Sequence, residues 1–230
     1  MPDPLFIVIA HPARKRAAEA LISVLKADSS WDTDGSGCEA NHRRAWEWAA
    51  DQDDPDRWVV FVEDDVALVR GFIGQVRRAL AVAPSELVSF YLGRGRPPHW
   101  QLPIAKAITT LPGPDVCWLS APELFSAQCY AMPVHRARGL ARTHRRSMPC
   151  DEHISRWARN RRLRVCYSWP SLVDHREDMV PLITERADGQ PRIERRVAWN
   201  VGIRGRWTSR THPIRTHAEL GVTVVRKAPA

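Results

Sequence analysis

Three consecutive acidic residues, Glu63, Asp64 and Asp65, directly follow the apolar run at residues 58–62. Side chains alternate along an extended chain, so we expect Glu63 and Asp65 on one side and Asp64 on the other. Two carboxylates on one side can bind a hard divalent cation such as Mg²⁺ or Mn²⁺. Crowded like charges also need a positive partner, and a cation that carries a diphosphate would supply one. A solvated acidic turn is the simpler alternative.

The elements that position these acids follow from hydrophobic periodicity. Residues 5–10 and 58–62 are continuous apolar runs typical of buried parallel strands, and the second strand is predicted over residues 57–62. Apolar residues at helical spacing predict helices over residues 13–27 and 41–50. Further strands are predicted at residues 87–92, 116–119, 128–132 and 163–167, further helices at 72–83, 134–146 and 151–161, and loops at 29–37 and 93–113. This order indicates an α/β sandwich with a mixed, mainly parallel central sheet. Its ligand crevice is expected at the carboxyl ends of the strands, where His11 and the acidic triplet lie.

A series of short motifs, in order, resembles the family 25 glycosyltransferases, which include lipopolysaccharide and collagen sugar transferases. The motifs are GCEANHRRAW (37–46), WVVFVEDDVAL (58–68), YLG (91–93), a Cys-Tyr-Ala-Met segment before a helix, PCDEHI (149–154) and WPSLVDH (169–175). They span residues 5–176, and EDDV and PSLVxH are the most specific pieces.

This resemblance implies a GT-A-like (Rossmann-like) fold, a nucleotide-sugar donor with uridine as the nucleoside, and a Mn²⁺ or Mg²⁺ ion held by a D-x-D-type motif. The motif maps onto Glu63 and Asp65, with Asp64 beside them, and His175 is placed to supply a late metal ligand. His153 could compete with His175 for that role. The first metal position is Glu instead of Asp, and the segment after residue 176 matches no part of the family's pattern.

The resemblance also implies roles for six residues around the donor and the acceptor. His11 and Arg14 follow the first strand, where GT-A folds meet the nucleoside and diphosphate, and Asn41 or Arg44 could reach the donor. Asp151 is the expected catalytic base and Glu152 the alternative, because both begin a predicted helix in the segment that resembles the family's acceptor-side acid. An acid at a helix start is as often a cap for the first turn.

Composition excludes several classes of protein. The chain has 230 residues, 44% of them hydrophobic and 26% charged, which is not the composition of a disordered tail, a collagen-like fibre or a disulfide-stapled mini-protein. No apolar run approaches the roughly 20 residues of a bilayer span. The start does not read as a secretory signal, so we expect a cytoplasmic protein, in the host cytoplasm if a bacteriophage encodes it. Five scattered cysteines without a C-x-x-C pair argue against a zinc ribbon and for reduced, buried thiols.

Charge divides the chain into an acidic and a basic part. Residues 1–130 hold 13 Lys and Arg against 17 Asp and Glu, whereas residues 131–230 hold 21 against 9. Arginines interspersed with tryptophans are typical of nucleic-acid-binding surfaces. DNA is therefore the expected partner of the second part, and a hydroxymethylated pyrimidine in DNA is the favoured acceptor; a protein or an envelope glycan is the alternative.

The expected organisation is a catalytic domain at residues 1–176 and a basic extension at 177–230, packed on or near the active site. A different class of function is a Mg²⁺-dependent nuclease or a nucleic-acid-binding protein, in which the acidic triplet would hold the metal for phosphodiester cleavage. A second acidic cluster of the kind that two-metal nucleases use is not evident in the sequence. Oligomeric state does not follow from these patterns.

Overall fold

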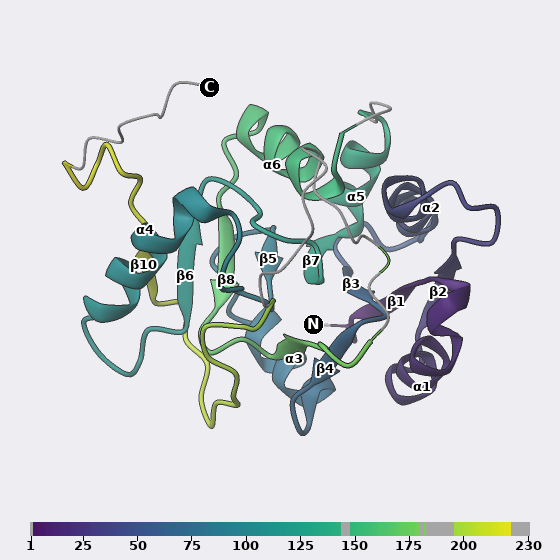
Figure 1. The fold of residues 1–230 in the computed structure, drawn as a ribbon, viewed down its shortest axis with the longest axis horizontal. Coiled ribbons are helices and arrows are strands. Elements are labelled where there is room, and N and C mark those ends of the chain that lie inside the picture. The colour runs from purple at the N-terminus through teal and green to yellow at the C-terminus, as the bar shows by residue number, and fades with distance from the viewer. Residues whose placement is uncertain (1, 144–147, 180–181, 183–195, 222–230) are drawn as a thin grey trace.

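The computed structural model describes residues 2–143, 148–179, 182 and 196–221. It shows helices on both faces of an eight-stranded mixed sheet of strand order β10-β6-β8-β5-β7-β3-β1-β2 (Figure 1). The helices are α1 (Lys15–Leu25), α2 (Cys38–Ala50), α3 (Phe72–Leu80), α4 (Pro98–Thr109), α5 (Val134–Ala141) and α6 (Cys150–Asn160), with a 3-10 turn at Pro12–Arg14. The strands are β1 (Leu5–Ala10), β2 (Asp28–Trp31), β3 (Trp58–Glu63), β4 (Val66–Leu68), β5 (Val88–Ser89), β6 (Trp118–Ala121), β7 (Cys129–Pro133), β8 (Val165–Ser168), β9 (Val173–His175) and β10 (Thr211–Pro213).

Two hydrophobic layers explain why the predicted strands are continuous apolar runs. Alternate side chains of β1 enter opposite layers, Ile7 and Ile9 in one and Phe6 and Val8 in the other. The first layer packs against α2, α4, α5 and α6, and the second against α1 and α3 (Figure 1). Because both faces of β1 and β3 are covered, these strands carry no exposed polar face. The prediction of an α/β fold around a mixed central sheet is confirmed.

Strand pairing is parallel for β1 with β2 and β3, for β5 with β8 and for β6 with β10, and antiparallel for β7 with β3 and β5 and for β6 with β8. The parallel register places Ala10 opposite Trp31 and Ile9 opposite Glu63. The carboxyl ends of β1, β2 and β3 therefore meet at one edge of the sheet. The residues that follow these strands share that edge.

A second, two-stranded sheet pairs β4 with β9 and lies over this edge. Its antiparallel register places Val66 opposite His175 and Ala67 opposite Asp174. The segment after the acidic triplet is thereby paired with a segment about 110 residues later in the sequence. This pairing brings His175 beside Asp65.

Several predicted elements differ from those in the structure. Residues 93–113, predicted as a loop, contain α4, with Pro98 in its first turn and Pro103 inside it. Buried Trp100, Ile104 and Ala107 pack this helix onto the sheet, and that burial outweighs the cost of the interior proline. β2 occupies the start of the predicted 29–37 loop. The helix predicted to reach residue 146 ends at Ala141, and its positions 144–147 lie outside the described residues.

The described part of the predicted C-terminal extension belongs to the same body as the rest of the chain. β10 is an edge strand of the central sheet, and Trp207 packs on Trp118 with its indole N–H donated to Gln75 Oε1 at 2.8 Å. The amide of Ala198 donates to Asp174 Oδ1 at 2.7 Å, next to β9. Part of this segment thus lies near the acidic edge, and part completes the sheet. Among the described residues, no helix has the length and apolarity to cross a bilayer.

Candidate functional site

Asp64 and Asp65 form a buried acidic pair at the carboxyl ends of β1 and β3, and Arg14 bridges them. Arg14 Nη1 lies 2.9 Å from Asp64 Oδ1 and 2.7 Å from Asp65 Oδ2. The backbone amide of His11 donates to Asp64 Oδ2 at 2.7 Å. Both carboxylates are nearly inaccessible, with 3% and 4% of their surface exposed. Burial raises the pKa of Asp64 even though Arg14 opposes it.

His175 approaches the same pair from β9. Its Nε2 lies 3.3 Å from Asp65 Oδ2. Burial acts to raise the pKa of Asp65, but the hydrogen bond from His175 and the charge of Arg14 lower it overall. Asp65 Oδ1 and His175 Nδ1 are buried without a hydrogen-bond partner among the described residues. The unpartnered Oδ1 belongs to the carboxylate that faces His175, whereas the lone pair of Nδ1 points away from the side of the imidazole ring that faces Asp65.

The predicted grouping of the triplet is wrong. We expected Glu63 and Asp65 on one side and Asp64 on the other, but Arg14 joins Asp64 to Asp65, and Glu63 accepts a contact from His42 Nε2 at 3.1 Å. Side-chain alternation applies only within a strand, and β3 ends at Glu63. Residues 64–65 form a turn into β4, so their side chains can converge.

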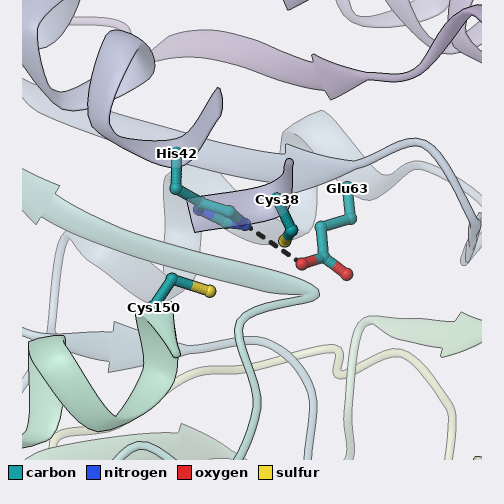
Figure 2. A group of neighbouring side chains, drawn as sticks. All are labelled: Cys38, His42, Glu63 and Cys150. Carbon is teal, nitrogen blue, oxygen red and sulfur yellow. Dashed lines mark hydrogen bonds and ion pairs between the residues drawn. The ribbon is translucent and has the colours of Figure 1, made fainter. Parts of the chain in front are cut away.

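Glu63 belongs to a second cluster, with Cys38, His42 and Cys150 (Figure 2). The ligand-type atoms of these four side chains all lie within 4.8 Å of one another. A hydrogen bond with Cys150 lowers the pKa of Cys38, and the same bond raises the pKa of Cys150. Burial acts to lower the pKa of His42, but the charges of Cys38 and Glu63 raise it overall. The cluster is an electrostatically coupled group of thiol, imidazole and carboxylate.

Asp151 lies in the first turn of α6, close enough to Glu63 for the two charges to interact. Burial raises the pKa of Asp151 to about 6, and the charges of Glu152 and Glu63 act in the same direction. Asp151 Oδ1 also accepts the backbone N–H of Glu152 at 2.9 Å, so the carboxylate satisfies one N–H of the first turn. Glu152 itself is exposed. Of the two candidate bases, Asp151 has the environment that favours proton uptake near neutral pH.

The structure gives three of the predicted donor-binding residues roles within the fold. Asn41 is buried, donates to the Ala10 carbonyl at 2.9 Å and accepts from the Ser30 hydroxyl at 2.5 Å, so its amide joins α2 to β1 and β2. The His11 ring caps the following turn by accepting the Ala13 amide at 3.1 Å. Neither side chain faces the Asp64–Asp65 pair through a contact that the structure records.

Arg44 is the third of these residues, and it holds the loop after β2, where it contacts Asp32 and Asp34. Its guanidinium also donates to the Trp31 carbonyl at 3.2 Å. His153, the other candidate late ligand, is buried against Trp46, with ring centroids 5.5 Å apart, and lies 3.4 Å from the Thr143 hydroxyl. His175 is therefore the histidine that the fold brings to Asp65.

Sequence reasoning missed the residues that complete the second cluster. Cys38 and Cys150 are 112 positions apart, and burial was the default expectation for each, yet Cys38 is exposed at the start of α2. A C-x₃-H spacing, Cys38 to His42, places both side chains on one face of a helix and was the available local signal. No local pattern could place Cys150 beside them.

A cavity of about 620 Å³ lies away from these groups. It is lined by residues that include Pro114, Pro170 and Arg204, and none of the predicted site residues lines it.

Comparison with known proteins assigns the chain to no family. No family model and no curated protein matches the chain. The crystal structure of A197 from STIV is similar at a TM-score of 0.42 and 11% identity, over 81% of this chain and 100% of that one. A likeness at this level carries no argument about the site or its chemistry.

Proposed function

We propose that this protein is a metal-dependent glycosyltransferase that moves a sugar from a nucleotide-sugar donor, with uridine as the expected nucleoside, to a hydroxyl acceptor. The observation that carries the proposal is the convergence of Arg14, Asp65 and His175 at one sheet edge. The three side chains come from segments far apart in the sequence. The motif resemblance to family 25 glycosyltransferases supports the same function.

Asp65 and His175 are the residues that would hold the divalent ion, with Asp64 beside them. Asp65 Oδ1 is buried without a hydrogen-bond partner among the described residues, so an ion bound there would satisfy it, and His175 would bind the same ion through Nε2, the ring nitrogen that faces Asp65. A mixed carboxylate and imidazole set favours Mn²⁺ over Mg²⁺, which prefers oxygen ligands. When bound, such an ion offsets the negative charge of a diphosphate leaving group.

The remaining roles fall to Arg14 and Asp151. Arg14 contributes a fixed positive charge beside the two carboxylates, at the sheet edge where a diphosphate would bind. Asp151, with a pKa of about 6, accepts the proton of the acceptor hydroxyl. Glu63, which precedes Asp64 in the chain, acts through its charge to raise the pKa of Asp151.

A hydroxymethylated pyrimidine in DNA is the acceptor that the charge distribution favours. The second half of the chain is strongly basic, and α6 carries exposed Arg156, Arg159 and the following Arg161 and Arg162. Asp151 lies on the first turn of the same helix. A phosphate backbone along the basic end of α6 would thus lie within roughly 15 Å of the proposed base, at about 1.5 Å per helical residue.

A screen of nucleotide sugars against hydroxymethylated and unmodified DNA tests the proposal. Each reaction contains Mn²⁺, and the digested nucleosides are read by mass spectrometry. A hexose or pentose mass added only to the hydroxymethylated nucleoside supports both the activity and the acceptor. Sugar transfer to a protein or a glycan instead of DNA supports the activity but shows that the acceptor is not DNA. Degraded plasmid without nucleotide-sugar consumption would contradict the proposal and favour a nuclease.

A further inference from the structure

The cluster of Cys38, His42, Glu63 and Cys150 brings together the ends of three elements. Cys38 and His42 lie one turn apart on α2, Glu63 ends β3, and Cys150 begins α6. Figure 2 shows the two sulfurs, the imidazole and the carboxylate directed toward one another. Their ligand-type atoms are mutually within 4.8 Å.

This spacing is close to that of a tetrahedral metal site. With bonds of about 2.0–2.3 Å, neighbouring ligand atoms around tetrahedral zinc lie roughly 3.3–3.8 Å apart. His42 Nε2 and Glu63 Oε1 are already 3.1 Å apart. Closure of the site therefore needs only small side-chain movements. Cys38 is exposed, which gives an ion a path from solvent, whereas His42 and Cys150 are buried.

The groups behind His42 also suit a metal ligand. His42 Nδ1 lies 3.1 Å from the Tyr130 hydroxyl, and that hydroxyl accepts the Trp46 indole N–H at 2.7 Å. A zinc ion bound to Nε2 would leave the remaining ring proton on Nδ1, where it can be donated to the Tyr130 hydroxyl. Metal-binding histidines are commonly oriented in this way, through a hydrogen bond from the other ring nitrogen.

We propose that Cys38, His42, Glu63 and Cys150 bind a zinc ion that ties the start of α2 and the start of α6 to the end of β3. Two thiolates with an imidazole and a carboxylate suit zinc, whereas Mn²⁺ and Mg²⁺ prefer oxygen ligands. Two thiol protons leave to solvent on binding. Because all four ligands come from the protein, the zinc site would be structural. Glu63 would then bind zinc, and Asp65 and His175 would bind the divalent ion of the proposed function. This inference does not depend on the glycosyltransferase proposal.

Metal analysis and cobalt spectroscopy test the site without any activity measurement. The full-length protein is purified with a non-thiol reductant, and its zinc is measured by mass spectrometry. The zinc-stripped protein is then titrated with Co²⁺. The expected result is one zinc per chain and, with cobalt, thiolate charge-transfer absorption together with the visible bands of a tetrahedral ion.

Three variants decide which thiols are ligands. C38S and C150S are expected to lose the charge-transfer absorption and to weaken zinc binding by more than the roughly 10–100-fold that loss of an outer-shell partner causes. C166A removes a buried thiol outside the cluster and should keep one zinc. C38S changes an exposed residue, so circular dichroism should show an intact fold.

Three results would overturn the proposal. They are a wild-type protein with neither zinc nor tetrahedral cobalt bands, bands that survive in both C38S and C150S, and a Cys38–Cys150 disulfide in the reduced preparation. A zinc-loaded protein without transferase activity would leave this site intact and count only against the proposed function.

Discussion

At the scale of single residues, the paired acids of this chain divide between two neighbouring sites. Asp65 faces Arg14 and His175, whereas Glu63 faces His42 and the two thiols. The acids of this edge therefore have two sets of neighbours: cationic and imidazole groups around Asp65, and an imidazole with two thiols around Glu63. On chemical grounds, each set would suit a different kind of ion.

The Arg14 bridge is expected to contribute strongly to stability. Its guanidinium and both carboxylates are nearly buried, so Arg14→Met leaves two close negative charges without their partner. We expect the free energy of unfolding to fall by about 3–5 kcal/mol in chemical denaturation at neutral pH. Arg16→Met, at an exposed position on α1, should change it by less than about 0.5 kcal/mol. Equal effects of the two substitutions would contradict the described ion pairs.

The Asp151 carboxylate should act in turnover and not only in the first turn of α6. Asp151→Asn is expected to lower kcat by about 10²–10⁴-fold while nucleotide binding, measured by calorimetry, stays unchanged. Glu152→Gln, at the exposed neighbour, should leave turnover close to wild type. A lower melting temperature with normal turnover in Asp151→Asn would show that Asp151 only caps the helix.

Local pattern predicted the sheet edge at which the three acids lie but not how their side chains divide. The apolar run of β3 and the acids after it indicated the correct sheet edge, because strand ends and ligand crevices coincide in α/β sheets. The side on which each acid lies depends on the turn at residues 64–65 and on His175, which is distant in the sequence. Cys150 and Tyr130 join Cys38 and His42 only through the tertiary fold.

At the scale of elements, helices and strands with a regular apolar pattern were predicted, and those that depend on distant packing were not. β1, β3, α3 and α6 lie close to their predicted bounds. α4 was not predicted because its two prolines and the glycines in the segment before it favour a loop locally. β4, β9 and β10 are three residues each and exist through their pairing partners, which no local window contains.

The segment that carries β10 is expected to be part of the folding unit. Trp207 is buried against Trp118 and hydrogen-bonded to Gln75, so Trp207→Ala should lower the free energy of unfolding by about 3–5 kcal/mol. Ile203, with 57% of its surface exposed in the same segment, provides the control: Ile203→Ala should change stability by less than about 0.5 kcal/mol. Denaturant titration followed by circular dichroism gives both values. A silent Trp207→Ala would contradict the packing of this segment.

At the scale of the whole molecule, the exposed arginines of α6 and the residues of the two proposed sites on α2 and α6 lie on the same side of the central sheet. The first hydrophobic layer includes α2 and α6, which supply the thiol cluster and Asp151, and α6 continues into exposed arginines. α1 and α3 cover the opposite face of the sheet (Figure 1). A large polyanion bound to the α6 side would therefore be near the acidic edge without covering α1 or α3.

Neutralising Arg159, Arg161 and Arg162 together to Gln should weaken binding to DNA. Each lost phosphate contact lowers the salt dependence of log K by about 0.9 on duplex DNA, so the slope should fall by up to about 3. The matched control is a triple Gln variant of the exposed Lys15, Arg16 and Arg78 on α1 and α3. Fluorescence anisotropy at several salt concentrations measures the slope. If both triple variants behave like wild type, the acceptor is not a nucleic acid.

The central claim is that a divalent ion at Asp65 and His175 supports transfer from a nucleotide sugar. The most direct measurement is Mn²⁺-dependent release of UDP from a UDP-sugar by wild type, Asp65→Asn and the exposed control Asp53→Asn. Loss of several kcal/mol of charge stabilisation corresponds to about 10²–10⁴-fold in rate. We predict a decrease of that size in Asp65→Asn alone, with circular dichroism unchanged. Metal-independent release, or full activity in Asp65→Asn, would contradict the claim.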